Sequence, residues 1–145
     1  HQVPVRWIDQ GASAAILLAK TPNRHIAGII EVWLKQYYSD KTNWREMLMD
    51  RAITPSLLPE EKEKAAQRLT PELQKYLWED NTVTRIIYPG EAVSGKAESL
   101  SLDKTPVVEG VLTGIRGQYL ILDREKVINI RRHSGYQVCL EWEGS

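Results

Sequence analysis

Hydrophobic residues recur at every third or fourth position between residues 23 and 38. This spacing places them on one stripe of a helix, as in helices that pack one face against a core. The stripe consists of Ile26, Ile30, Trp33, Leu34 and Tyr37. We therefore predict a helix over residues 23–38, followed by a further turn or two of helix capped by Thr42.

Three other segments of the first 80 residues carry recognisable patterns. Residues 4–10 predict a short helix that begins with Pro4 and ends at Gly11. The apolar run over residues 14–19 has the length of a strand buried on both faces. Residues 59–80 predict a helical hairpin, because a proline opens each of its two halves.

The pattern changes near residue 81, where β-branched residues, period-two alternation and glycine turns replace the helical spacing. Short segments separated by such turns are predicted as strands. They cover residues 82–88, 99–103, 107–113, 118–123, 127–131 and 136–142. Five or six short strands favour a small closed or half-closed antiparallel β-barrel. The expected fold is therefore α+β, with a mostly helical part over residues 1–80 and a β-barrel domain over residues 81–145.

Charge is balanced along the chain. The 19 basic and 19 acidic side chains give a formal net charge of zero. Residues 1–80 carry 11 of each sign and residues 81–145 carry 8 of each. No broad electrostatic field therefore attracts nucleic acid or an anionic membrane, and any such binding requires a local patch.

Cys139 is the only cysteine of the 145 residues. A single thiol forms neither an internal disulfide nor a cysteine-rich zinc site, which favours a reducing compartment. The alternation around Cys139 predicts that it points inward as a small buried residue. The longest apolar run is too short to span a bilayer, and no signal-peptide pattern is visible. These features favour a soluble cytoplasmic protein without membrane contact.

Four sequence strings in order resemble one bacterial family, known as domain of unknown function 2797. They are QVPVRWIDQGA at residues 2–12, DKTNWR at 40–45, SLSLDKTP at 99–106 and GIRGQYL at 114–120. In that family these strings form the second half. The resemblance therefore implies a preceding part with clustered cysteines, which agrees with a chain that begins at His1 without a methionine. We expect the chain to be the carboxy-terminal piece of a larger protein.

The order of predicted elements is similar, more distantly, to the core of the GIY-YIG nucleases. That core carries an arginine on one helix, a glutamate on the next and an asparagine after it. Here the matching residues are Arg6, Glu31 and Asn43. The resemblance implies that Glu31 binds Mg²⁺ or Mn²⁺ on the scissile phosphate and that Arg6 stabilises the developing charge. The two tyrosine tripeptides of those nucleases are absent, so a truncated site is expected to be inactive.

Each of these residues also has an ordinary structural interpretation. Glu31 lies at the edge of the buried helix face, and it could simply pair with Lys35 one turn later. Arg6 could pair with Asp9 or Asp40 on the surface. Asn43 has the residue type that caps helices.

The second half offers a different candidate site. Arginines alternate with aromatic residues there, which supplies charge for phosphates and rings for bases. The expected binding residues are Arg116, Tyr119, Arg131, Arg132 and Tyr136. Cross-strand ion pairs with nearby acidic residues would explain the same arginines. Two hypotheses therefore stand: a metal-dependent nucleic-acid-processing enzyme centred on Arg6 and Glu31, and a non-catalytic module that binds nucleic acid or protein through the barrel.

Overall fold

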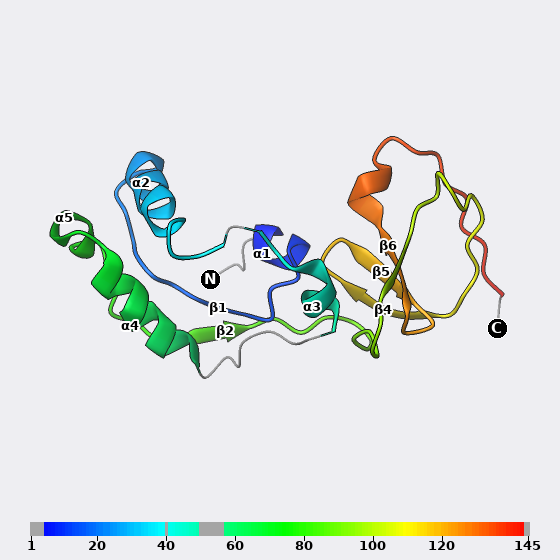
Figure 1. Cartoon of the computed structure of the whole chain (residues 1–145), viewed down its shortest axis with the longest axis horizontal. Coiled ribbons are helices and arrows are strands. Elements are labelled where there is room, and N and C mark those ends of the chain that lie inside the picture. Colours follow the sequence, from blue (N-terminus) through cyan, green and yellow to red (C-terminus); the bar gives the residue numbers. More distant parts are fainter. Residues whose placement is uncertain (1–4, 40, 50–56, 144–145) are drawn as a thin grey trace.

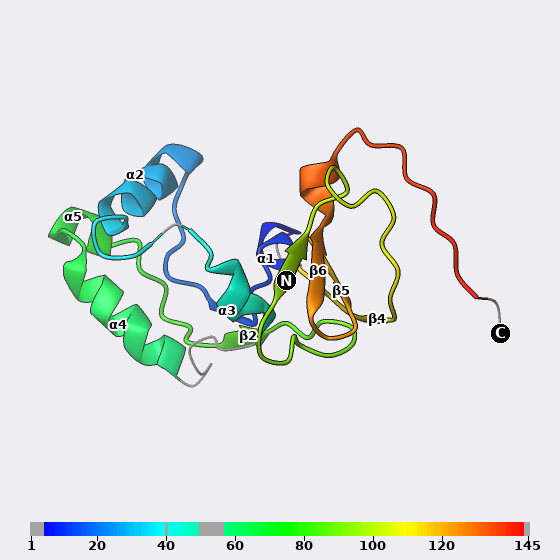
Figure 2. The same cartoon turned by 45° about the vertical axis from the view of Figure 1, so that its right-hand side comes forward.

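The computed structural model describes residues 5–39, 41–49 and 57–143. Its elements, in chain order, are α1 Val5–Asp9, β1 Ala14–Ile16, α2 Arg24–Leu34, α3 Trp44–Leu48, α4 Leu58–Arg68, α5 Pro71–Gln74, β2 Val83–Arg85, β3 Glu98–Leu100, β4 Leu112–Arg116, β5 Tyr119–Leu122, β6 Lys126–Asn129 and a 3₁₀ helix Ile130–His133. Helices α2, α4 and α5 form one end of the elongated molecule and β3–β6 the other, with α1 and α3 between them (Figures 1 and 2). The prediction of a mixed α+β fold is confirmed.

The helical end is organised around α2. The Asn23 side chain caps this helix by accepting a hydrogen bond from the Ile26 backbone N–H at 3.0 Å. The helix ends at Leu34, four residues before the predicted end. Ile30 is buried against Leu69 and Leu73. Partly buried side chains complete this cluster: Leu18, Ala19, Ile26, Leu34, Tyr76 and Leu77.

The predicted helical hairpin over residues 59–80 is confirmed only in its first half. Helix α4 opens with Pro59 at its first turn and spans three turns, because its interior has strong helix formers. The second half contributes the single turn α5, which also opens with a proline, Pro71. Helix α4 contacts α2 through the Trp33 indole, whose N–H donates to the Arg68 carbonyl at 2.7 Å.

A two-stranded antiparallel sheet joins the two parts of the sequence. Strand β1 pairs with β2 so that Ala14 lies opposite Arg85 and Ile16 opposite Val83. All three residues of β1 are half-buried. The strand predicted over residues 14–19 is therefore shorter than expected, and it is not buried on both faces. The strand predicted over residues 82–88 likewise forms only as β2.

The second half contains a four-stranded sheet in the order β3-β6-β5-β4. Strand β3 runs parallel to β6, whereas the β4–β5 and β5–β6 pairs are antiparallel. Among the described residues no pairing joins the edge strands β3 and β4, so a closed barrel is not confirmed. Residues 107–111, predicted as a strand, lie outside β4.

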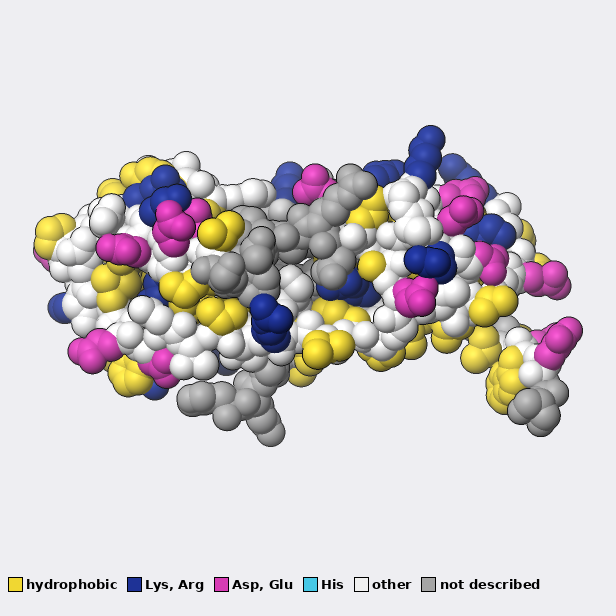
Figure 3. All heavy atoms as spheres, turned by 90° about the horizontal axis from the view of Figure 1, so that it is seen from below, with side chains coloured by type: hydrophobic (Ala, Val, Ile, Leu, Met, Phe, Trp, Pro, Cys, Tyr) yellow, Lys and Arg dark blue, Asp and Glu magenta, His cyan; other side chains and the backbone are white. Residues whose placement is uncertain are grey.

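The segment predicted as the last strand, residues 136–142, forms no strand. It leaves the sheet and extends away from the body of the molecule (Figures 1 and 3). Val138, Leu140 and Trp142 are 60%, 77% and 78% exposed. Cys139 is exposed as well, so the prediction that it is buried was wrong. Period-two alternation specifies an extended chain, but only a neighbouring edge makes it a strand.

The core of the sheet includes residues from the first half of the chain. Met47 and Leu48 of α3 pack with five buried residues of the second half, namely Val93, Ala97, Tyr119, Ile121 and Val127. Leu48, Ile121 and Val127 are the most completely buried of them. This cluster crosses the expected domain boundary after residue 80, because α3 covers the sheet rather than joining α2.

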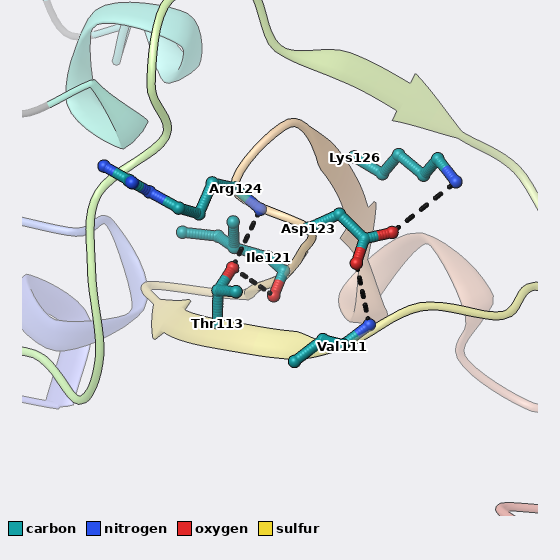
Figure 4. A network of polar contacts seen from close by, with 6 residues as sticks. All are labelled: Val111, Thr113, Ile121, Asp123, Arg124 and Lys126. Atoms are coloured by element: carbon teal, nitrogen blue, oxygen red, sulfur yellow. Dashed lines mark hydrogen bonds and ion pairs between the residues drawn. The ribbon is translucent and has the colours of Figure 1, made fainter.

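A polar network fixes the turn between β5 and β6 (Figure 4). Asp123 and Arg124 have φ angles of 52° and 59°, a left-handed conformation that side chains other than glycine adopt at a cost. The Asp123 carboxylate accepts a hydrogen bond from the Val111 N–H at 2.9 Å. The Arg124 N–H donates to the Thr113 hydroxyl oxygen at 3.0 Å. These contacts hold the strained turn against the start of β4.

Candidate functional site

A pocket with a volume of about 500 Å³ lies at the helical end of the molecule, where α1, β1, α2 and the first half of α4 meet. Its lining falls into three groups according to exposure. The rim is exposed and consists of Arg6, Gln10, Glu31, Lys35, Ser39, Lys41 and Thr42. The walls are half-buried and consist of Ile16, Leu18, Leu34, Tyr38, Leu58 and Glu61. Lys62 and Ala65 are buried and form the floor.

Arg6 and Glu31, the two residues predicted to be catalytic, line this same pocket. Arg6 is the second residue of α1, and Glu31 lies in the last turn of α2. The two helices are separated in sequence by β1, and the fold brings them to one rim. The structure therefore places Arg6 and Glu31 at one pocket.

The ordinary interpretations of these two residues predict ion pairs, and only those with Lys35 and Asp9 lie within the described residues. No ion pair among the described residues involves Glu31, including the expected pair with Lys35. Arg6 has no ion pair there either, because Asp9 pairs with Arg131 at 2.8 Å. The other expected partner, Asp40, lies outside the described residues. The charges of Arg6 and Glu31 thus face the pocket without compensation from a described neighbour.

The rim is predominantly basic. Among the described residues of the rim, Arg6 and Lys41 contribute two positive charges besides Lys35, against the one carboxylate of Glu31. Glu61 on the wall is compensated by Lys64, whose ammonium lies 3.3 Å from it. The entrance therefore favours an anionic ligand.

The buried floor does not offer a charge to a ligand. The Lys62 ammonium donates hydrogen bonds to the carbonyls of Trp78 at 2.5 Å and Asp80 at 2.9 Å. A buried lysine needs such partners, because an unpaired ammonium out of water is costly. The remaining wall and floor residues are mostly apolar. The pocket thus has a charged entrance and an apolar interior.

Tyr38 has a hydroxyl group that is closed off from solvent and has no hydrogen-bond partner among the described residues. Its ring lies beside the Arg68 guanidinium, with 5.3 Å between the guanidinium carbon and the ring centroid. A buried hydroxyl without a partner costs about 1–3 kcal/mol. A side chain of the pocket wall therefore carries a buried hydroxyl without a partner among the described residues.

Acidic side chains are few in the pocket lining. The described residues contain no group of three or more histidine, cysteine, aspartate or glutamate side chains placed to bind a metal. Glu31 and Glu61 are the acidic residues of the pocket. Mg²⁺ commonly binds through one or two carboxylates plus substrate phosphates, so this donor set is compatible with it.

Asn43, the third residue of the nuclease resemblance, lies outside the pocket. Its side chain accepts a hydrogen bond from the Glu46 backbone N–H at 3.3 Å and caps α3. The capping interpretation of Asn43 is therefore observed. Thr42, predicted to cap this helix, lines the pocket rim instead.

Two of the predicted binding residues of the second half are buried. Tyr119 is 7% exposed, and its ring stacks on Trp44 with centroids 5.6 Å apart. Arg116 is 9% exposed, and its guanidinium lies over the Tyr88 ring at 5.0 Å. Neither side chain is presented on the surface as a binding patch would require. Alternating positions in a strand point to opposite faces, and these two face the interior.

The other three predicted binding residues lie near the 3₁₀ helix. Arg131 and Arg132 are exposed on it, and Arg131 contacts Asp9. Tyr136 packs edge-on against His133, and its hydroxyl donates a hydrogen bond to Asp103. This bond and burial raise the pKa of Tyr136. The fold therefore separates the five residues into a buried pair and an exposed group.

Lys41, Tyr38 and Lys62 belong to the pocket, but the sequence pattern did not indicate them. Lys62 stands in a run of alternating glutamates and lysines that is typical of a solvated helix face. Nothing in that local pattern marks it as buried. Its role follows from the carbonyls of Trp78 and Asp80, which come 16 and 18 residues later.

The fold and the pocket define a mixed α+β protein with two sheets and an open, charged pocket at its helical end. The chain belongs to the family described as Protein of unknown function (DUF2797), whose family model matches residues 1–138. No curated protein and no solved structure matches the chain. The position in the second half of a longer protein and the likeness to GIY-YIG nucleases receive no support from these comparisons.

The helices of the described residues are short. The longest two, α2 and α4, have 11 residues each. A membrane-spanning helix needs about 20 apolar residues. Within the described part of the chain, no helix therefore has the length and apolar character to cross a membrane.

Proposed function

We propose that the pocket is a phosphodiester-processing site that acts on nucleic acid with a divalent cation. The observation that carries the proposal is the shared position of Arg6 and Glu31 on one rim, without an ion pair to the other described residues. Opposite charges on separate helices at one open rim suit a substrate that has both a negative phosphate and a cation bound to it.

The chemistry assigned to each residue follows from its charge. The Glu31 carboxylate would hold Mg²⁺ or Mn²⁺, and Glu61 on the wall of the same pocket could contribute a second oxygen ligand. A divalent cation at this point supplies Lewis acidity to a phosphoryl oxygen. As the oxygen of a water molecule bonds to phosphorus and the bond to the leaving oxygen breaks, the Arg6 guanidinium would donate hydrogen bonds to the phosphate oxygens and stabilise the developing charge. The water gives up a proton to solvent, and the leaving oxygen takes one from it.

The test is cleavage by the full-length protein of labelled single- and double-stranded DNA and RNA, with Mg²⁺, with Mn²⁺ and with a chelator. We expect metal-dependent cleavage that Glu31→Gln abolishes and Arg6→Ala lowers by at least about a hundredfold. Two matched controls lie outside the pocket, on the exposed surface of the same end: Glu63→Gln and Arg24→Ala. Cleavage by Glu31→Gln at the wild-type rate would refute the proposal.

The exposed arginines of the 3₁₀ helix support a second candidate function, a binding surface without catalysis. Arg131 and Arg132 are adjacent and exposed there. This function predicts a salt-dependent gel shift that Arg131→Ala together with Arg132→Ala removes while Glu31→Gln leaves it unchanged. A shift that persists in the double variant would exclude this surface.

A further inference from the structure

We infer that the pocket recognises one unpaired nucleotide, with its phosphate at the basic rim and its base against the apolar walls. This inference rests on the proposed function in one respect, that the ligand is nucleic acid. It adds the form of the substrate, a strand end or an unpaired position in preference to the interior of a duplex.

The volume of this open pocket suits a ligand of about one nucleotide. Its volume is about 500 Å³. Pockets that enclose a single small ligand have volumes of about 300–1,000 Å³. A duplex is instead contacted along an extended surface, with side chains reaching into grooves. A base inside this pocket must therefore be unpaired.

The apolar side chains are placed where a base would lie. Ile16, Leu18, Leu34 and Leu58 form the half-buried walls, and Ala65 the floor. They come from β1, the segment after it, α2 and α4. Every base has an apolar π-face, and enclosing that face between such side chains removes it from water. An inorganic phosphate would leave these walls without a contact.

The distribution of positive charge sets the orientation of the nucleotide. The ammonium of Lys62 is engaged by the carbonyls of Trp78 and Asp80, so the floor does not attract a phosphate. Arg6 and Lys41 lie on the exposed rim. The phosphate therefore remains at the entrance while the base points inward. The same arrangement, a backbone outside and a base in a pocket, is used by proteins that extrude a nucleotide from a strand.

The test measures binding by calorimetry, so that it does not depend on cleavage. The probes are adenosine monophosphate, uridine monophosphate, adenosine and inorganic phosphate, each added to the full-length protein. We expect both monophosphates to bind at least about tenfold more tightly than inorganic phosphate or adenosine. Monophosphates that bind no better than inorganic phosphate would overturn the inference, because the walls would then contribute nothing.

Two variants separate the walls from the rim. Leu58→Glu places a charge on an apolar wall at the first residue of α4, where an acidic residue suits the helix. It should weaken adenosine and monophosphate binding at least about tenfold. Leu57→Glu, one residue earlier and outside the lining, is the matched control.

Lys41→Ala tests the rim. It should weaken binding of the monophosphates and leave binding of adenosine unchanged. Equal effects of Leu57→Glu and Leu58→Glu would refute the placement of the base.

Oligonucleotides complete the test. Single strands and duplexes with frayed ends should bind at least about tenfold more tightly, per nucleotide, than a relaxed circular duplex, which has neither ends nor unpaired positions. Equal affinity for the circular duplex would overturn the inference. Nucleotide binding without metal-dependent cleavage would instead refute the proposed function and leave the inference standing.

Discussion

The carboxylate of Asp9 and the guanidinium of Arg131 lie 2.8 Å apart, although 122 residues separate them in the sequence. Asp9 is the last residue of α1, and Arg131 belongs to the 3₁₀ helix that follows β6. The pair therefore links the helix that carries Arg6 to the four-stranded sheet. It also removes Asp9 as a partner for Arg6, whose guanidinium is left at the pocket rim.

The Asp9–Arg131 pair is expected to contribute little to stability. The two side chains are 33% and 67% exposed, so water screens their attraction. A double-mutant cycle with Asp9→Asn and Arg131→Ala, followed by chemical denaturation, should give a coupling free energy of about 0.2–1 kcal/mol that falls as salt is added. Arg132→Ala serves as the control and should show no coupling to Asp9. Equal coupling to both arginines would contradict the pairing.

Among the glycines near the pocket, Gly11 should tolerate replacement by a larger residue least well. Its φ is +71°, and a Cβ atom there would lie 2.2 Å from the sulfur of buried Met47. Gly11→Ala should therefore lower the free energy of unfolding by about 1–2 kcal/mol for the backbone conformation alone, and further through the clash. Gly28 in α2 has open space around its Cβ position. Gly28→Ala should stabilise the protein by up to about 1 kcal/mol. Chemical denaturation of both variants should show a lower free energy of unfolding for Gly11→Ala and a higher one for Gly28→Ala.

Asp80 gives the stability a pH dependence of known sign. Hydrogen bonds from the Thr82 hydroxyl and backbone N–H lower the pKa of Asp80 below its ordinary value of 3.8. The folded state therefore gains stability at pH values above that ordinary value, and it loses this contribution as the pH falls through the lowered pKa. Asp80→Asn should make the loss of stability in acid less steep, as measured by denaturation across that range. Glu79→Gln is the control, and a steeper loss in Asp80→Asn would contradict the assignment.

Cys139 should react as a surface thiol in the native protein. It lies in the extended segment after the 3₁₀ helix and is exposed. Access is one of the factors that set thiol reactivity, so a thiol-specific reagent should modify one cysteine per chain at close to the rate seen in denaturant. Cys139→Ser should not react. Protection that disappears only on unfolding would show that another surface covers this segment.

Local patterns were sufficient for the elements that depend on near neighbours. Helix α2 follows from its apolar stripe, and α4 follows from the proline at its start. The turns before β5 and β6 lie where glycine or polar residues interrupt the apolar runs. The predictions failed where strand formation requires pairing with a strand that is distant in the sequence. Residues 136–142 alternate like a strand and yet have no strand beside them.

For the candidate site, too, the sequence indicated some features and tertiary packing decided the others. Arg6 and Glu31 were selected from the order of elements and a resemblance, and their residue types are compatible with phosphate and cation contacts. Their meeting at one pocket, the burial of Lys62 and the withdrawal of Tyr119 into the core follow from tertiary packing. Hydrophobic period and capping are local, because they involve residues within a few positions of one another. Which helix covers which sheet depends on contacts between residues far apart in the sequence. Those contacts also decide whether a lysine or a tyrosine is buried in the structure or exposed for binding.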